Sequence, residues 1–412
     1  MPAVNAEQVA IRRLVPLYLV VFVGFVGYSL MIAIFTPLLL RADGGMLPRT
    51  DSLAVRTILL GVVLAVYPLA QFLAAPVIGG LSDRFGRRPT LLVSLATSSC
   101  CYALIAVAVQ TRTLALLIVG CLLAGLSEAN IAVAQSAIAD LAPASQRSRL
   151  FGYVYLSSSL AYVVGPLAGG RLADPNLVGW FDYATPFWAT VALLACVFGL
   201  TAALFVETST PRDDAGVHLG RALSSLADAF RAGRLRRLYL ANFVLYLSIF
   251  GFFRVYPMYL VDHFHMTVSR ESLFVAWVAV PIVAANAGIV SWLAKRMTPL
   301  QTLTIGAGVL AVVMATIVIP NTQGPLWVTL GATALVLAVC LPAAATIVSE
   351  ATEPEQQGRA LGSNQSLQVG AEALSGLSGG LLAAITDVLP LSAMAALAAI
   401  ACLCFHRAPT NP

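Results

Sequence analysis

Apolar residues form long blocks along the whole chain, and short polar segments with turn residues and charges separate them. An α-helix needs about 20 apolar residues to cross the hydrocarbon layer of a bilayer. The sequence therefore predicts an all-α polytopic membrane protein. Twelve transmembrane helices are expected, at 14–40, 56–81, 90–110, 114–142, 149–173, 185–206, 238–262, 271–294, 300–320, 325–350, 360–385 and 389–405.

Composition agrees with a membrane protein. Of the 412 residues 59% are hydrophobic and only 10% are charged, whereas a soluble domain has about 25% charged residues. No enzyme motif, nucleotide-binding loop or metal cluster is found in the sequence. We therefore expect no enzymatic activity, no cofactor and no bound metal. The net charge of +5 requires no nucleic-acid partner, because most of it falls in predicted cytoplasmic loops.

The basic residues orient the predicted helices. Most of them lie in segments that share one side if the N-terminus is inside, so the positive-inside rule predicts that both termini are cytoplasmic. The longest loop is rich in arginine and amphipathic, which predicts a helical connector on the inner membrane surface. The expected domains are an N-terminal six-helix half (1–206), a connector (207–237) and a C-terminal six-helix half (238–412).

A weak internal repeat supports two related halves. A shift of 210 residues aligns QRSRLFG (146–152) with QQGRALG (356–362), and VVGPLAGG (163–170) with ALSGLSGG (373–380). Two repeated halves of this kind are typical of secondary transporters, whose sites lie near the bilayer midplane.

The loop GGLSDRFGRRP (79–89) resembles the signature loop of the major facilitator superfamily, G-x-x-x-D-R-x-G-R-R. Gly79 would allow close helix packing. The resemblance implies that this loop is a conformational latch and that its arginines pair with an acid at the inner end of the fourth helix, where Asp140 stands. The latch residues are Gly79, Asp83, Arg84, Gly86, Arg87, Arg88 and Asp140.

The fifth predicted helix is similar to a second signature of this superfamily, which is associated with proton-coupled antiporters. It is formed here by Gly152, Gly165, Pro166, Gly169 and Gly170, with Ala161 in place of one glycine. Together the two motifs resemble the drug:proton antiporter branch, which includes tetracycline-efflux proteins. Cys121 stands where that branch has an arginine, so the charge chemistry must be placed elsewhere or reduced.

Three ionisable residues lie deep inside predicted helices: Glu128, Arg254 and Glu372. A charge at the bilayer centre costs about 2.5–3.5 kcal/mol on insertion scales, so such groups usually face a cavity or a partner. Glu128 and Glu372 are therefore candidates for proton coupling and substrate binding. Either could instead be a protonated acid that hydrogen-bonds a neighbouring helix. Arg254 could neutralise one of them in an ion pair or bind an anionic group of the substrate.

Cys121, Glu128 and Gln135 are predicted to share one face of the fourth helix, because they are seven residues apart. Other polar residues of the helices expected to line the cavity complete the substrate-binding hypothesis: Tyr28, Gln71, Asn130, Gln135, Asn242, Tyr246, Gln365 and Gln368.

The leading functional hypothesis is a secondary active transporter that exports an amphiphilic organic solute in exchange for protons, by alternating access. It would act as a monomer in the bacterial inner membrane, with the small-molecule solute, protons and the lipid bilayer as its partners. The alternatives are a proton-coupled or facilitative importer of a metabolite, such as an amino acid, sugar or siderophore, and a non-transporting sensor. The antiporter-type motif favours export, and the latch loop argues against a sensor.

Overall fold

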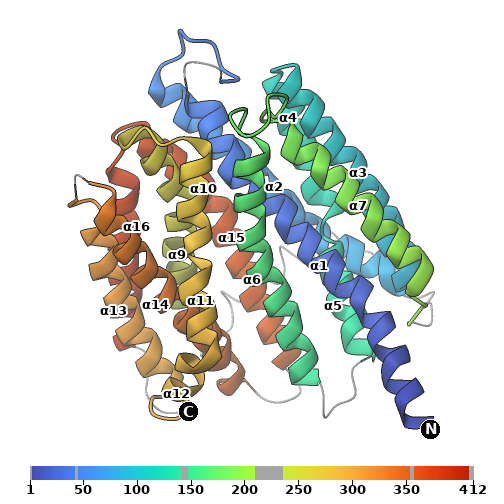
Figure 1. Ribbon diagram of the computed structural model, residues 1–412. Helices are drawn as coiled ribbons and strands as arrows, with labels where there is room; N and C mark the ends of the chain where they lie inside the picture. Colours follow the sequence, from blue (N-terminus) through green and yellow to red (C-terminus); the bar gives the residue numbers. More distant parts are fainter. Residues whose placement is uncertain are drawn as a thin grey trace. The chain divides into compact units, whose positions relative to one another are not determined.

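The computed structural model describes residues 2–41, 45–141, 147–208, 235–320, 322–352 and 357–407. Within these ranges the regular structure is helical (Figure 1). The predicted all-α fold is confirmed, and each expected span overlaps a described helix or a run of short helices. Nine of the described helical stretches are long and apolar enough to cross a membrane. The amphipathic helix predicted in the connector lies outside the described residues.

The chain forms two compact units that do not follow a single cut in the sequence. Unit 1 comprises Met1–Ile34 and Leu69–Arg221, and unit 2 comprises Phe35–Pro68 and Ala222–Pro412. Helices α1 (Pro2–Leu40) and α2 (Leu53–Phe85) therefore contribute one part to each unit. The part of α2 in unit 2 contacts helices from the second half of the sequence.

Besides its parts of α1 and α2, unit 1 contains α3 (Arg87–Gln110), α4 (Leu114–Ser127), α5 (Asn130–Leu141), α6 (Arg147–Leu172) and α7 (Thr185–Leu204). Helix α3 packs against both α4 and α7 (Figure 1).

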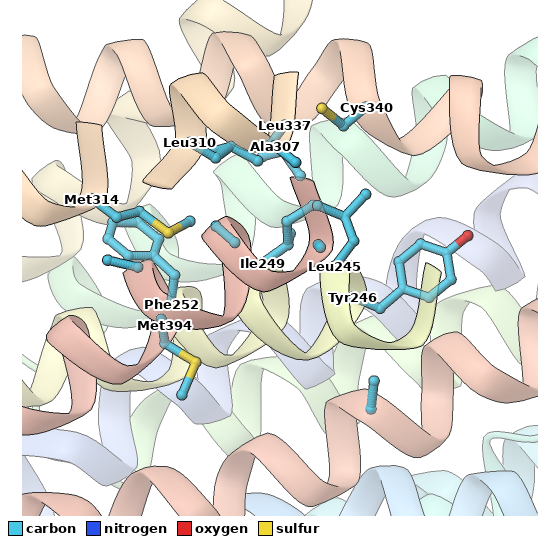
Figure 2. Packing of buried hydrophobic residues seen from close by; sticks show 14 of the residues in the cluster. Leu245, Tyr246, Ile249, Phe252, Ala307, Leu310, Met314, Leu337, Cys340 and Met394 are labelled. Carbon is cyan, nitrogen blue, oxygen red and sulfur yellow. The ribbon is translucent and has the colours of Figure 1, made fainter. Parts of the chain in front are cut away.

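In unit 2, α9 packs against α15 and α16, and α13 packs against α14 and α16. Figure 2 shows Leu245, Ile249 and Phe252 of α9 among buried side chains of α13, α14 and α16. The helices are α9 (Arg236–His263), α10 (Val268–Trp277), α11 (Ala279–Ala284), η1 (Ala285–Ile289), α12 (Val290–Ala294), α13 (Pro299–Thr316), α14 (Gly324–Glu350), α15 (Gln357–Ala383) and α16 (Leu389–His406).

The span predicted at 271–294 is not one continuous helix. It is divided into α10, α11, a π-helical segment and α12. Pro281 explains the first interruption, because a proline ring clashes with the carbonyl four residues earlier, here that of Trp277, where α10 ends. The π-helical segment that follows is of a kind often found at functional sites.

Candidate functional site

The fourth predicted span breaks at Glu128. Helix α4 ends at Ser127 and α5 begins at Asn130, and Glu128 and Ala129 form a turn between them. Two weak bonds close this turn, from Ile131 N to Glu128 O (3.4 Å) and from Ala132 N to Ala129 O (3.3 Å). The prediction that Cys121, Glu128 and Gln135 share one face relied on a continuous helix, which the structure interrupts between Ser127 and Asn130.

Neighbouring helices satisfy the carbonyl groups that the break releases. The Ser94 hydroxyl of α3 donates to Ser127 O, and the Gln71 amide of α2 donates to Glu128 O at 3.2 Å. The hydroxyl groups of Ser98 and Ser127 are 2.9 Å apart. Because hydrocarbon offers no hydrogen bonds, a broken helix persists in a membrane only where such partners exist. Gln71 therefore lies at the Glu128 turn.

The Glu128 side chain is buried, with 1% of its surface exposed. The Tyr102 hydroxyl group interacts with its carboxyl group, and Gly24 of α1 lies close enough that a Cβ there would be 4.0 Å from Glu128 Oε2. Asn130 is also buried, and its Oδ1 has no hydrogen-bond partner within the described ranges. Two buried polar side chains thus flank the break.

The other candidates in unit 1 are less closely associated with the break. Tyr28 is buried and packs edge-on against Tyr162, with ring centroids 6.4 Å apart. Gln135 is half-buried on α5. The roles of Tyr28 and Gln135 as substrate ligands stay predictions.

In unit 2, Arg254 and Glu372 form an ion pair. Arg254 Nη2 lies 3.4 Å from Glu372 Oε1, and the two side chains are 2% and 14% exposed. Arg254 Nη1 also donates to the backbone carbonyl of Leu64 in α2. A single guanidinium thus joins α9, α15 and α2. The sequence allowed two acids as ion-pair partners of Arg254, and the structure shows the pair with Glu372.

Close backbone packing accompanies this ion pair. A Cβ at Gly61 of α2 would lie 2.6 Å from Gly376 O and 2.9 Å from Gly380 Cα. Gly376 and Gly380 are four residues apart on α15, the small-xxx-small spacing that lets membrane helices approach closely. The pairing of α2 with α15 therefore depends on residues without side chains.

One face of α15 is polar. Gln365, Gln368 and Glu372 follow one another at intervals of three and four residues, which places them on one side of a helix. Gln365 is exposed, Gln368 is half-buried and Glu372 is largely buried. The structure therefore aligns these three candidates with one another.

The two candidates on α9 take part in a buried network. Asn242 Nδ2 donates to Ala344 O at 3.0 Å and to Asn364 Oδ1 at 2.9 Å, and Asn364 Nδ2 donates to the Tyr246 hydroxyl at 2.7 Å. This network connects α9 with α14 and α15. Sequence reasoning missed Asn364, although the polar run Ser363–Ser366 in an apolar block was a usable signal.

The loop between α2 and α3 holds an ionic cluster. Arg87 contacts both Asp83 (2.7 Å) and Asp140 (3.3 Å), so the structure brings these three latch candidates together. Arg84 lies over the Phe85 ring at 5.3 Å, and Arg88 donates to Ala202 O at 2.7 Å.

Sequence reasoning missed Glu207, which follows α7. Its carboxylate accepts hydrogen bonds from the backbone N–H groups of Arg87 (2.8 Å) and Arg88 (2.9 Å), at the N-terminus of α3, where the helix dipole favours a negative charge. Gly86 has a φ of +98°, and a Cβ there would lie 2.5 Å from Glu207 Oε2, so both its backbone and its surroundings require glycine. At Gly79, by contrast, no described atom lies within 4 Å of a Cβ position.

The antiporter-type motif packs α6 against α1. Ser29 of α1 donates to Ala161 O at 3.0 Å, and a Cβ at Gly165 would lie 2.0 Å from Ser29 Oγ. Pro166 stands inside α6. A Cβ at Gly169 would be in ordinary contact with Leu30 at 3.4 Å. Gly170 is buried on the same helix, and the surroundings of Gly152 lie outside the described part of the chain.

A family model described as Major Facilitator Superfamily matches residues 17–338 and 238–412. The chain belongs to the major facilitator superfamily. The predicted family and fold are thereby confirmed, and the chain is a multi-pass membrane transporter of this superfamily and not an enzyme.

Individual relatives refine this family assignment. The chain is 39% identical over 160 residues to the tetracycline resistance protein, class B, of Escherichia coli, covering 39% of this chain and 38% of the relative. It is 43% identical over 136 residues to the class C protein of Escherichia coli, covering 33% and 34%. The matched segments thus span little more than a third of these relatives.

Solved structures of low sequence identity agree in fold. The human organic anion transporter MFSD10 (TETRAN) has a TM-score of 0.69 at 18% identity, covering 96% of this chain and 99% of that one. A D-xylose–proton symporter has a TM-score of 0.74 at 15% identity, covering 96% and 97%. At these identities the likeness shows the fold alone.

Proposed function

We propose that this transporter exports an amphiphilic organic solute in exchange for protons, by alternating access. The proton gradient supplies the energy, and no cofactor takes part. The protein acts as a monomer in the bacterial inner membrane, with both termini in the cytoplasm. The similarity to tetracycline resistance proteins supports an organic drug such as tetracycline as the cargo.

The observation that carries this proposal is the ion pair of Arg254 with Glu372 and its bond to Leu64 O. A proton on Glu372 would remove the counter-charge of a buried guanidinium, and an unpaired buried charge is costly. Arg254 would then have to find a new partner or move. Because it also holds α2, this local event would loosen the contact between α2, α9 and α15.

Glu128 offers a second proton-binding carboxyl group, at the break between α4 and α5. Discontinuous helices of transporters commonly expose polar backbone at a binding site. Here Asn130 adds a buried amide with an unsatisfied oxygen beside the acid. We assign the first contact with the solute to this region, and the two proton sites to Glu372 and Glu128.

The test is transport in proteoliposomes containing the purified protein, with tetracycline as the probe and an imposed pH gradient. An antiporter accumulates the probe in vesicles that are acidic inside, whereas a symporter does so when the outside is acidic. Glu372→Gln should abolish gradient-driven accumulation while retaining tetracycline counterflow. The control is Asp174→Asn, in the loop between α6 and α7. Accumulation of tetracycline only in vesicles whose outside is acidic would reject export by antiport.

A further inference from the structure

A polar cluster at the C-terminal end of α9 is not used by the function proposed above. His263 Nδ1 lies 2.7 Å from Asp387 Oδ2, in the turn before α16. The His263 ring stacks on Tyr259, with centroids 4.9 Å apart and planes inclined by 20°. The sequence places this end of α9 on the outer side of the membrane.

Beside this cluster is a small cavity within unit 2. It has room for a single occupant about the size of a water molecule, about 10 Å³. Tyr259, Asp262 and Asp387 supply its polar lining, and apolar side chains including Leu40 and Met258 supply much of the rest.

The Tyr259 hydroxyl group is an independent sign of a ligand. Tyr259 is 1% exposed, and its hydroxyl has no hydrogen-bond partner within the described ranges. A buried polar group left unsatisfied costs about 1–3 kcal/mol. The other hydroxyl of the lining, on Thr57, already donates to carbonyls of its own helix. An occupant of the cavity would give the Tyr259 oxygen a partner.

The charges around the cavity define the sign of that occupant. Asp262 and Asp387 repel one another, and Asp387 also repels a negative charge on Tyr259. The basic groups that face Asp262 are His263 and His265, and His263 also pairs with Asp387. Two carboxylates and a phenol oxygen around a water-sized space suit a positive occupant.

We propose that this cavity binds one monovalent cation of about the size of water, either hydronium or an alkali metal ion. The carboxylates of Asp262 and Asp387 neutralise its charge, and the Tyr259 oxygen completes its contacts. The bound ion would hold the end of α9 to the turn before α16, and this site does not depend on the direction or cargo of transport.

The test is thermal unfolding of the full-length purified protein in detergent, with sodium, lithium or potassium chloride replaced by choline chloride at constant ionic strength. At mildly alkaline pH, an alkali ion should raise the Tm of the wild type in a saturable way. If hydronium is the occupant, the rise should appear on acidification without alkali ions. Either response should disappear in Tyr259→Phe, which changes no carboxylate.

Matched variants distinguish the proposed cation site from the neighbouring ion pair of His263 with Asp387. Asp387→Asn should also lose the response, whereas His263→Gln should keep it, because His263 does not line the cavity. Asp174→Asn should behave as the wild type. The proposal would be overturned if the Tm of the wild type depended on ionic strength alone and Tyr259→Phe kept the pH response of the wild type. Stabilisation by magnesium but by no alkali ion would also overturn it. If Asp387→Asn does not fold, Tyr259→Phe still decides.

Discussion

The two units each bury a glutamate, but they hold it in different ways. In unit 1, Glu128 lies at a helix break, where hydroxyl and amide groups of α2 and α3 bind the released carbonyls and Tyr102 faces the carboxyl group. In unit 2, Glu372 lies inside an intact helix and pairs with a guanidinium. Neutral polar groups therefore surround Glu128, whereas a positively charged guanidinium contacts Glu372.

Because of this difference, loss of the carboxylate should have different consequences for stability and transport at Glu372 and at Glu128. At Glu372 a buried cation is left behind, so stability and coupling should change together. At Glu128 the serine and glutamine bonds go to the backbone and survive a change of side chain. A substitution there should affect transport with little effect on folding.

The largest expected effect is that of Glu372→Gln on stability. Removing one partner of a buried ion pair costs about 3–5 kcal/mol, because the other charge stays buried. We expect a loss of about 3 kcal/mol in the free energy of unfolding, measured by denaturant or thermal unfolding in detergent. The double variant Arg254→Gln with Glu372→Gln should recover most of this loss, yet still lack gradient-driven transport. An unchanged stability in the single variant would contradict the ion pair.

Glu128→Gln should give the opposite pattern. The amide has nearly the same shape, and the bonds to Ser127 O and Glu128 O remain, so the free energy of unfolding should change by less than about 1 kcal/mol. Gradient-driven accumulation of tetracycline should fall to the level of empty vesicles, because the variant cannot bind the proton. The double variant Glu128→Gln with Gln135→Glu tests whether a carboxyl group on α5 restores proton coupling. Wild-type flux in Glu128→Gln would remove this acid from the proton path.

Close backbone packing allows a smaller test of the same comparison. Gly61→Ala in unit 2 would place a Cβ 2.6 Å from Gly376 O, and Gly165→Ala in unit 1 would place one 2.0 Å from Ser29 Oγ. Overpacking costs about 1–3 kcal/mol. Gly61→Ala should be the more damaging, because the nearest atoms to its Cβ are all backbone atoms of α15. At Gly165 the Ser29 hydroxyl can rotate away, and the nearest backbone atom, Val26 O, is 2.9 Å from the Cβ. Gly199→Ala, with open space around it, should be neutral or slightly stabilising in the same unfolding assay.

The sequence was sufficient for the helical fold and the three deep charges. Apolar blocks of membrane-spanning length are unmistakable, and Glu128, Arg254 and Glu372 are conspicuous inside them. The partner of Arg254 was not predictable, because the distance between α9 and α15 is a property of tertiary packing. Pro281 did carry a readable signal for the interrupted helix, since proline prevents the preceding turn from continuing.

Several other polar residues of the two units were harder to find. Membrane helices often carry serine and asparagine, so residue type alone did not distinguish Ser94 or Asn364, and only the polar run around Asn364 was a signal. Glu207 was assigned to a connector, although it binds the N-terminus of α3. The break at Glu128 has neither glycine nor proline at the turn itself. Side chains of α2 and α3 bond to the opened backbone from outside the broken segment, and we infer that they are its cause.

The smallest expected effect tests that cause directly. Ser94→Ala removes the hydroxyl that donates to Ser127 O and leaves a buried carbonyl with one bond fewer, which should cost about 1 kcal/mol in the free energy of unfolding. The matched control is Thr97→Ala on the same helix, because the exposed Thr97 hydroxyl bonds only to Val93 O of its own turn. The control should stay within about 0.5 kcal/mol of the wild type. If the break serves to position Glu128, Ser94→Ala should also slow gradient-driven flux while Thr97→Ala does not. Equal effects of the two variants on stability and flux would mean that the turn is stable without α3, and that the backbone of α4 and α5 opens for reasons within its own sequence.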